Sequence, residues 1–360
     1  MNNKLTIEVE SKLVYFKIEI KHKVTVITGH SGVGKSVLTR AIVNDSGKYK
    51  KKIPSGYVCS VIYGENWMLD FKLAVNDSKD LKNVARIFIF DDVDYMKTDY
   101  FSTLFKEDKR NFYIFINRFI SINESSLGRI PYSIYSVYNL VTDGRNHWLE
   151  PKYNFEVKPD NYYDYVITED STSGLEFLKG YNINVSSSKS KDNIISMLRS
   201  NMDLLKAKKV LIFVDLASFG SCIRKVIEFA QSNNLSVSFV PDYQCFEYLL
   251  LTSNLVKKLK SKEMILAYSS NISNVAKFSS LEKLYESLLS YITKNTILHQ
   301  GHGGELNVCY CIDCKDCHKN KKKFSCNYGL KGNKQEALIQ GTQWEGVLTA
   351  VSNSELIELK

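Results

Sequence analysis

The residues best suited to chemistry in the first half of the chain form a glycine-rich turn. It reads Gly29-His30-Ser31-Gly32-Val33-Gly34-Lys35-Ser36, which is the spacing GxxxxGK[ST]. Glycines let the backbone curl so that its N–H groups point at phosphate oxygens, and a following helix adds the positive end of its dipole. Lys35 is placed to reach the β- and γ-phosphates of a nucleotide, and Ser36 to ligate Mg²⁺. The turn therefore predicts a site for ATP with Mg²⁺.

Further polar residues follow two apolar runs. The run 85–90 ends in Asp91 and Asp92. We expect Asp91 to hold Mg²⁺, directly or through water, and Asp92 to orient or deprotonate the attacking water. The run 111–117 ends in Asn117, which is either a γ-phosphate sensor or a plain turn residue. Thr28 and His30 are further candidates to touch the nucleotide, and Arg118, Arg129 and Arg145 are the arginines available as fingers.

The second half of the chain has its own acids after apolar runs. Glu169 follows YVIT and Asp215 ends VLIFVD. Acids at the carboxyl ends of parallel strands are typical of α/β sites, so the sequence predicts a site at this edge of the second sheet.

Cysteines concentrate near the end of the chain. Five of the eight lie between Cys309 and Cys326, and no export signal is apparent at the first residues. This clustering favours metal ligation over disulfide bridges. We predict a structural Zn²⁺ site formed by Cys311, Cys314, Cys317 and Cys326, with Cys309 and His318 as substitutes. Free or redox-active thiols and an iron–sulfur site are the alternatives.

Composition and charge set the class of protein. The 360 residues are 44% hydrophobic and 24% charged, which excludes a disordered chain and suits two or three domains. No apolar stretch is long enough to span a membrane, so we expect a cytoplasmic protein. The net charge of +9 is spread evenly, which argues only weakly for nucleic-acid binding. The basic runs 48–52 and 319–323 are either solvated loops or phosphate contacts.

The order of apolar runs predicts an α/β fold with a parallel sheet covered on both faces. In the first domain, 1–157, we expect strands at 13–20, 23–28, 58–63, 85–90 and 111–117, with helices after the glycine turn and at 99–109, and a closing hairpin within 132–157. In a second α/β domain, 158–298, we expect strands at 164–168, 181–185, 210–215 and 235–240, with helices at 173–179, 190–205, 218–233 and 281–292. The cysteine-rich segment and tail occupy 299–360.

With these motifs, the first ~150 residues resemble P-loop NTPases, nearest to AAA-like and short phage or mobile-element ATPases. Two features of that superfamily are missing, namely an LSGGQ-like signature and a helical lid. Asp92 also stands where many active ATPases carry Glu. The resemblance therefore implies ATP binding more firmly than fast hydrolysis.

Residues 164–240 resemble the TOPRIM domain of topoisomerases, primases and overcoming-lysogenization-defect nucleases. In that family a Glu acts as general acid or base, and a DxD pair binds Mg²⁺ beside the scissile phosphate. Glu169 matches the first position and Asp215 the first acid of the pair, so the resemblance implies that these two residues bind Mg²⁺. The second acid of the pair would be residue 217, which is Ala217. One carboxylate alone holds a divalent cation poorly, and the candidates for the missing ligand are Asp170, Asp242 and Glu247.

Two functions follow from these resemblances. In the first, the nucleotide state controls a TOPRIM-like, metal-dependent nuclease that acts on nucleic acid, as in phage-defence or mobile-element systems. In the alternative, ATP switches an assembly or regulatory protein that recruits a protein partner or forms a homo-oligomer, and the second domain is a catalytically degenerate docking module. A third hypothesis is a nucleotide or small-molecule kinase, for which the sequence shows no recognisable lid or acceptor site.

Overall fold

The chain folds into two compact units. The first is built from Met1–Asn154, Ser218–Ser221 and Tyr268–Leu281, and the second from Phe155–Ala217, Cys222–Ala267 and Glu282–Lys360. The computed structural model describes residues 5–44, 47–80, 84–91, 100–116, 132–153, 163–169, 171, 175, 178, 185–217, 220–240, 245, 247–248, 251 and 267–293. Among these residues, no helix has both the length and the apolar character needed to cross a membrane.

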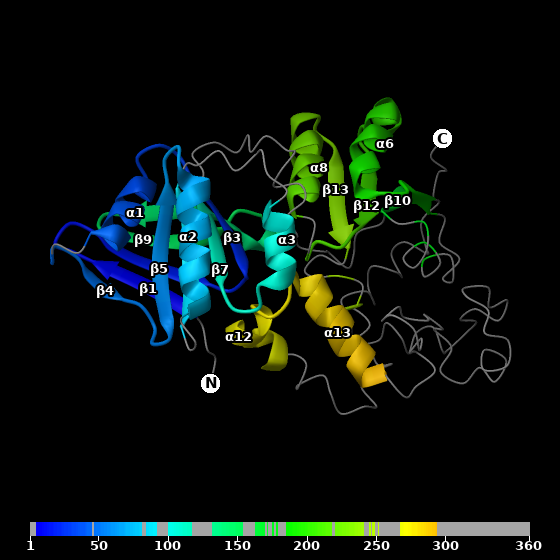
Figure 1. Cartoon of the computed structure of the whole chain (residues 1–360). Helices are drawn as coiled ribbons and strands as arrows, with labels where there is room; N and C mark the ends of the chain where they lie inside the picture. The colour runs from blue at the N-terminus through cyan, green and yellow to red at the C-terminus, as the bar shows by residue number, and fades with distance from the viewer. Residues whose placement is uncertain are drawn as a thin grey trace. The chain divides into compact units, whose positions relative to one another are not determined.

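A nine-stranded sheet forms the first unit, in the order β4-β1-β2-β9-β8-β3-β7-β6-β5 (Figure 1). Its strands are β1 Leu5–Glu10, β2 Tyr15–Ile20, β3 Val24–Thr28, β4 Lys50–Lys52, β5 Tyr57–Tyr63, β6 Ala85–Asp91, β7 Phe112–Ile116, β8 Val137–Asp143 and β9 Asn146–Pro151. A short 3₁₀ turn, η2 (Ile134–Ser136), precedes β8.

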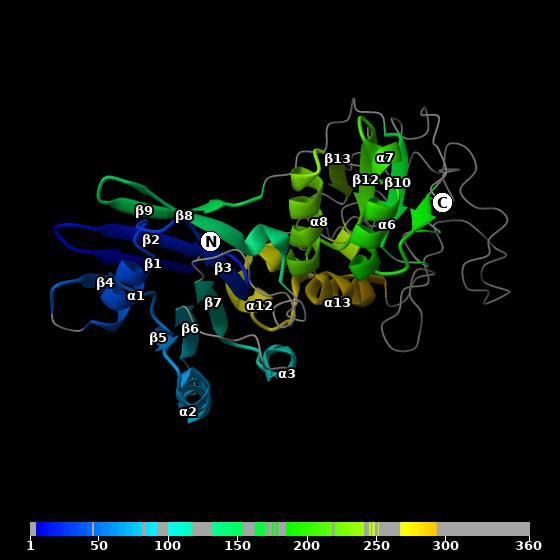
Figure 2. The ribbon, with the colours of Figure 1, turned by 90° about the horizontal axis from the view of Figure 1, so that it is seen from above.

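The sheet is mixed, which corrects the expectation of a parallel sheet. The five strands β8, β3, β7, β6 and β5 are parallel. By contrast, β1 pairs antiparallel with β2 and β4, and β8 with β9, while β2 lies parallel to β9. Figure 2 shows this second part of the sheet, with β1 and β2 beside the β8–β9 hairpin. Short turns join β1 to β2 and β8 to β9, and such turns require antiparallel pairing.

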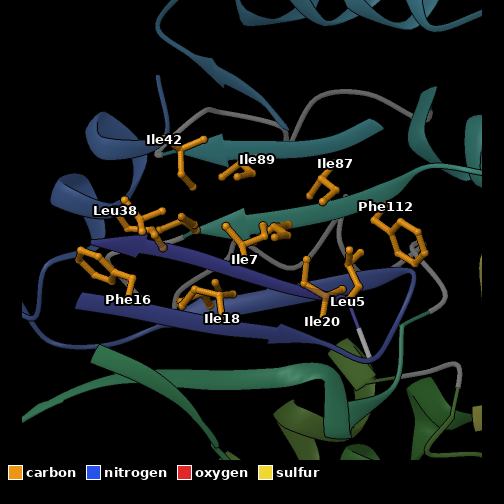
Figure 3. Packing of buried hydrophobic residues seen from close by; sticks show 14 of the residues in the cluster. Leu5, Ile7, Phe16, Ile18, Ile20, Leu38, Ile42, Ile87, Ile89 and Phe112 are labelled. Carbon is orange, nitrogen blue, oxygen red and sulfur yellow. The ribbon is translucent and has the colours of Figure 1, made fainter. Parts of the chain in front are cut away.

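One face of this sheet packs on α1 (Lys35–Val43). Residues with a period of two on β1 and β2 point to this face and are almost fully buried. Leu38, Ala41 and Ile42 of α1 meet them. Figure 3 shows the core that results, with Leu5, Ile7, Phe16, Ile18, Ile20, Leu38, Ile42, Ile87, Ile89 and Phe112 labelled.

The other face carries aromatic side chains under α2 (Trp67–Asp80) and α3 (Tyr100–Glu107). The alternation in β6 sends Ile87 and Ile89 to the α1 face and leaves Phe88 and Phe90 for the opposite one. Phe71 of α2 lies edge-on to both of these rings, with centroid distances of 4.9 and 5.0 Å. Both faces of the central strands are thus covered, as their continuous apolar character predicts.

The last three residues of the basic run 48–52 form an edge strand rather than a loop. Residues Lys50–Lys52 pair antiparallel with Glu8–Glu10 of β1. Lys52 makes an ion pair of 3.4 Å with Glu8. Acidic residues on the neighbouring strand thus explain why three lysines are accepted here.

A segment from late in the chain completes the core of the first unit. The short helix α12 (Ile272–Val275) brings Ile272 and Ala276 into the cluster formed by β1, β2 and α1. Both side chains are at most 5% exposed. The domain limits expected from the sequence, 1–157 and 158–298, place this segment in the second domain instead.

The second unit contains a four-stranded parallel sheet, in the order β11-β10-β12-β13. Its strands are β10 Tyr165–Thr168, β11 Ser186–Ser187, β12 Lys209–Phe213 and β13 Ser236–Val240. Its helical elements are η3 Lys191–Asn193, α6 Ile194–Ser200, α7 Met202–Leu205, α8 Gly220–Ser232 and α13 Leu281–Thr293, although the first residues of α8 belong to the first unit. Most of the strand expected at 181–185 and of the helix expected at 173–179 lies outside the described residues.

Candidate functional site: a glycine loop, its acid strand and a second acidic edge

The glycine loop joins β3 to the first turn of α1, as the sequence predicts. Gly29, Gly32 and Gly34 adopt φ values of +146°, +89° and +96°. These angles favour glycine over any other residue. A Cβ on Gly29 would lie 3.0 Å from Val33 and 3.2 Å from the carbonyl oxygen of Leu140, so crowding adds to the requirement.

The side chain of Lys35 folds back onto the glycine loop. The side chain is buried, and its Nζ donates to the carbonyl oxygens of Gly29 at 2.5 Å and His30 at 2.9 Å. The first turn of α1 carries no acidic residue, so nothing there opposes its positive dipole end. The loop thus gathers a lysine ammonium and a helix N-terminus around one short stretch of backbone, which is an arrangement suited to phosphate.

Asp91 ends β6, and β7 lies between that strand and β3. Its carboxylate oxygen Oδ2 accepts a hydrogen bond of 2.6 Å from the hydroxyl of Thr39. Thr39 is buried on α1, one turn after Ser36, whose carbonyl oxygen also lies 3.2 Å from the same hydroxyl. The acid of β6 is therefore held against the helix that begins at the loop.

Thr39 is a residue that the motif does not identify. The only signal in the sequence is its spacing of three from Ser36, which places the two residues on the same side of a helix. The hydrogen bond from the Thr39 hydroxyl holds the Asp91 carboxylate in a fixed direction. Oxygen ligands such as a serine hydroxyl and a carboxylate suit a hard divalent cation, so Ser36 and Asp91 fit the predicted Mg²⁺.

His147 of β9 is a second residue that sequence reasoning missed. Its ring stacks on Phe16 with a centroid distance of 4.3 Å, and Nδ1 lies 3.2 Å from the carbonyl oxygen of Val33 in the loop. A Cβ on Gly34 would come within 3.1 Å of this ring. Burial lowers the pKa of His147, and the Val33 carbonyl opposes that shift. A neutral imidazole thus buttresses the loop from the side of the sheet.

Two residues that the sequence suggested for the nucleotide site have partners within the first unit. The hydroxyl of Thr28 is directed at β8, where the Tyr138 carbonyl oxygen and Asn139 Oδ1 lie 3.1 and 2.8 Å away. Arg145 pairs with Glu10 at 2.7 Å on the exposed side of the hairpin. Asp92, Asn117, Arg118 and Arg129 lie outside the described residues, so the roles predicted for them stay predictions.

In the second unit, Glu169 and Asp215 follow the neighbouring parallel strands β10 and β12. The backbone N–H of Glu169 donates to the Phe213 carbonyl oxygen at 3.1 Å, which brings the two strand ends together. Ala217 is 1% exposed and belongs to the core of its unit. A methyl group in that place cannot bind a cation.

Glu247 is the described candidate to replace the missing acid. Burial, together with the charges of Glu282 and Glu286 of α13, raises the pKa of Glu247 to about 7. Burial also raises the pKa of the neighbouring Cys245 thiol, with the carboxylates of Glu247 and Asp215 acting in the same direction. Acids from three parts of the chain therefore lie near this edge of the sheet. Asp170 and Asp242, which could also supply the missing carboxylate, fall outside the described residues.

Metal binding by three or more side chains is not apparent in the part of the chain that the structure describes, since no such group of His, Cys, Asp and Glu is close enough there. The predicted zinc ligands Cys311, Cys314, Cys317 and Cys326 all lie outside that part. Zinc binding therefore stays a prediction.

No protein-family model matches the chain, and no curated protein is similar to it at a significant level. The functional argument therefore depends on the residues and their geometry.

Proposed function

We propose that the first unit binds ATP at the Gly29–Ser36 loop and hydrolyses it with Mg²⁺. The observation that carries the proposal is the combination of three left-handed glycines, an inward-directed Lys35 and an acid at the end of β6 that α1 holds in place. The position of β6, one strand removed from β3, also supports a P-loop NTPase arrangement.

Each residue has a role in this proposal. Backbone N–H groups of the loop and the first turn of α1 bind phosphate oxygens, and Lys35 exchanges its bonds to the Gly29 and His30 carbonyl oxygens for bonds to phosphate. Ser36 and Asp91 hold Mg²⁺, which neutralises charge that develops on the phosphoryl group. His147 and Thr39 keep the loop and Asp91 in their directions.

Nucleotide titration tests the proposal. Binding of a fluorescent ATP analogue is expected to weaken at least about tenfold in Lys35→Ala, because the charge-assisted contacts to phosphate are lost. Lys21→Ala removes an exposed lysine from the same unit and should bind as the wild type does. Phosphate release with Mg²⁺ then separates binding from hydrolysis, and wild-type affinity in Lys35→Ala would contradict the assignment of the site.

For the second unit we propose a TOPRIM-like, Mg²⁺-dependent action on nucleic acid that depends on the nucleotide state. The support is the placement of Glu169 and Asp215 at the carboxyl ends of adjacent parallel strands, with Glu247 and Cys245 nearby. The buried Ala217 favours the alternative, in which this unit is a docking module and ATP switches assembly with a protein partner.

Plasmid cleavage distinguishes the two functions. Supercoiled DNA is incubated with Mg²⁺ or Mn²⁺, with and without ATP, and the wild type is compared with Glu169→Ala. Nicking that disappears in the variant supports the nuclease and makes Glu169 catalytic. Intact DNA in the presence of normal ATP turnover supports the docking module instead.

A further inference from the structure

The outer edge of β5 has no strand beside it among the residues that the structure describes. This strand is the last in the order of the nine-stranded sheet, and no described strand pairs with the side that faces away from β6. A groove of about 730 Å³ runs along it, with Ile42, Val43 and Lys51 on one wall and Asp70 and Ala74 of α2 on the other. In Figure 1, β5 lies between α1 and α2 with no strand in front of it.

The residues of β5 itself do not protect this edge against strand pairing. Natural proteins cover such edges or place charges and prolines along them. The β5 sequence, YVCSVIY, contains neither a charged residue nor a proline. Val58 is 37% exposed and Tyr63 is 61% exposed, so apolar surface accompanies the free backbone groups. A strand of this composition is suited to receive another strand.

The sequence of β5 identifies the partner. YVCSVIY reads nearly the same in both directions about Ser60. Antiparallel pairing centred on Ser60 would place Tyr57 opposite Tyr63 of a second copy, Val58 opposite Ile62 and Cys59 opposite Val61. Aromatic pairs and pairs of β-branched residues are favourable directly across an antiparallel ladder. We propose that β5 pairs with β5 of a second copy of this chain, on a two-fold axis at Ser60.

The two faces of β5 agree with this pairing. Tyr57, Cys59 and Val61 pack on the α1 face of the sheet, so Val58, Ser60 and Ile62 belong to the α2 face. A two-fold axis perpendicular to the sheet keeps each face on its own side, and the cores under α1 and α2 then continue into the second copy. The pairing needs no nucleotide, so it is independent of the proposed ATPase.

Charge at residue 60 tests the pairing. Ser60→Lys would put two ammonium groups directly opposite each other, and Ser60→Glu two carboxylates, whereas a mixture of the two variants would pair opposite charges. Sedimentation velocity of the full chain over a wide concentration range should show a wild-type dimer. Each single variant should dissociate at least about tenfold more readily, and the mixture should recover the dimer. Leu13→Lys, at an exposed site in the turn between β1 and β2, is the control and should dimerise as the wild type does.

A cysteine at the axis gives a second measurement, which matters because Ser60 accepts a hydrogen bond of 3.1 Å from Arg86 and a charge there alters that contact. Under mild oxidation, Ser60→Cys should form a disulfide between copies, identified by mass spectrometry of the linked β5 peptides, whereas Leu13→Cys should form no such cross-link through residue 13. A wild-type chain that stays monomeric, or a Ser60→Lys variant that dimerises normally, would overturn the proposal and leave the edge to a strand from another protein.

Discussion

At the scale of single residues, Thr39 helps to fix the direction of the Asp91 carboxylate. Its hydroxyl donates to the carboxylate at 2.6 Å from a buried position. In Thr39→Val that hydrogen bond is lost, and a hydrogen bond to a charged group contributes roughly 1.5–3 kcal/mol. We expect affinity for Mg²⁺–ATP to fall about tenfold, while affinity for ATP in EDTA stays unchanged, because Asp91 acts through the cation.

The matched control is Thr39→Ser, which keeps the hydroxyl and should bind as the wild type does. Calorimetric titration with and without Mg²⁺ measures both affinities. An equal loss of affinity in the presence and absence of Mg²⁺ would mean that Thr39 supports only the packing of α1.

His22 makes stability depend on pH. Burial, followed by the charge of Lys21, lowers the pKa of His22 to about 4, and its Nδ1 has no hydrogen-bond partner among the described residues. Between pH 6.5 and 4 the unfolded chain binds a proton that the folded chain excludes, so the free energy of unfolding falls with acidification, by about 1–2 kcal/mol at pH 5. Urea unfolding at pH 7 and pH 5 should show this loss in the wild type and a smaller one in His22→Leu. Identical losses in both proteins would assign the pH dependence to the carboxylates.

At the scale of elements, two glycines in the loop between β3 and α1 distinguish two costs of replacing glycine, namely backbone strain and steric crowding. Gly32 and Gly34 both have left-handed φ values, but a Cβ on Gly32 meets nothing within 4 Å, whereas one on Gly34 meets His147 at 3.1 Å. Gly32→Ala should cost about 1 kcal/mol of stability from backbone strain alone. Gly34→Ala should cost roughly 1 kcal/mol more and weaken ATP binding, measured by thermal unfolding and nucleotide titration. Equal costs would mean that the His147 ring moves aside freely.

The elements also show what could be predicted from the sequence. Strands buried on both faces, such as β6 and β7, have continuous apolar runs, and the glycine spacing fixes the loop between β3 and α1. The strand β4 could not be predicted, because three lysines form a strand only when the acids of β1 lie opposite them. The sequence did not predict His147 and Thr39 as parts of the site for a similar reason. Their partners, Val33 and Asp91, are distant in the chain and become neighbours only when the sheet has formed.

At the scale of the whole molecule, chain order and spatial order differ. Amphipathic spacing indicates which side of a helix is buried, but it does not say which sheet that side will cover. The segment 268–281 follows the strands of the second unit, yet it belongs to the first. The first unit is therefore completed by residues that follow the second sheet in the sequence.

That dependence gives a prediction for Ile272. Its side chain is 5% exposed within the core cluster of the first unit, so Ile272→Ala should lower stability by about 2–4 kcal/mol. Leu13→Ala, at a site that is 76% exposed, should change stability by less than about 0.5 kcal/mol. Urea unfolding, followed by tryptophan fluorescence, reports mainly on this unit because two of the three tryptophans, Trp67 and Trp148, lie in it. If Ile272→Ala unfolds as the wild type does, residues 1–154 are sufficient for the core; if it unfolds early and loses ATP binding in parallel, the late segment is an integral part of the nucleotide-binding unit.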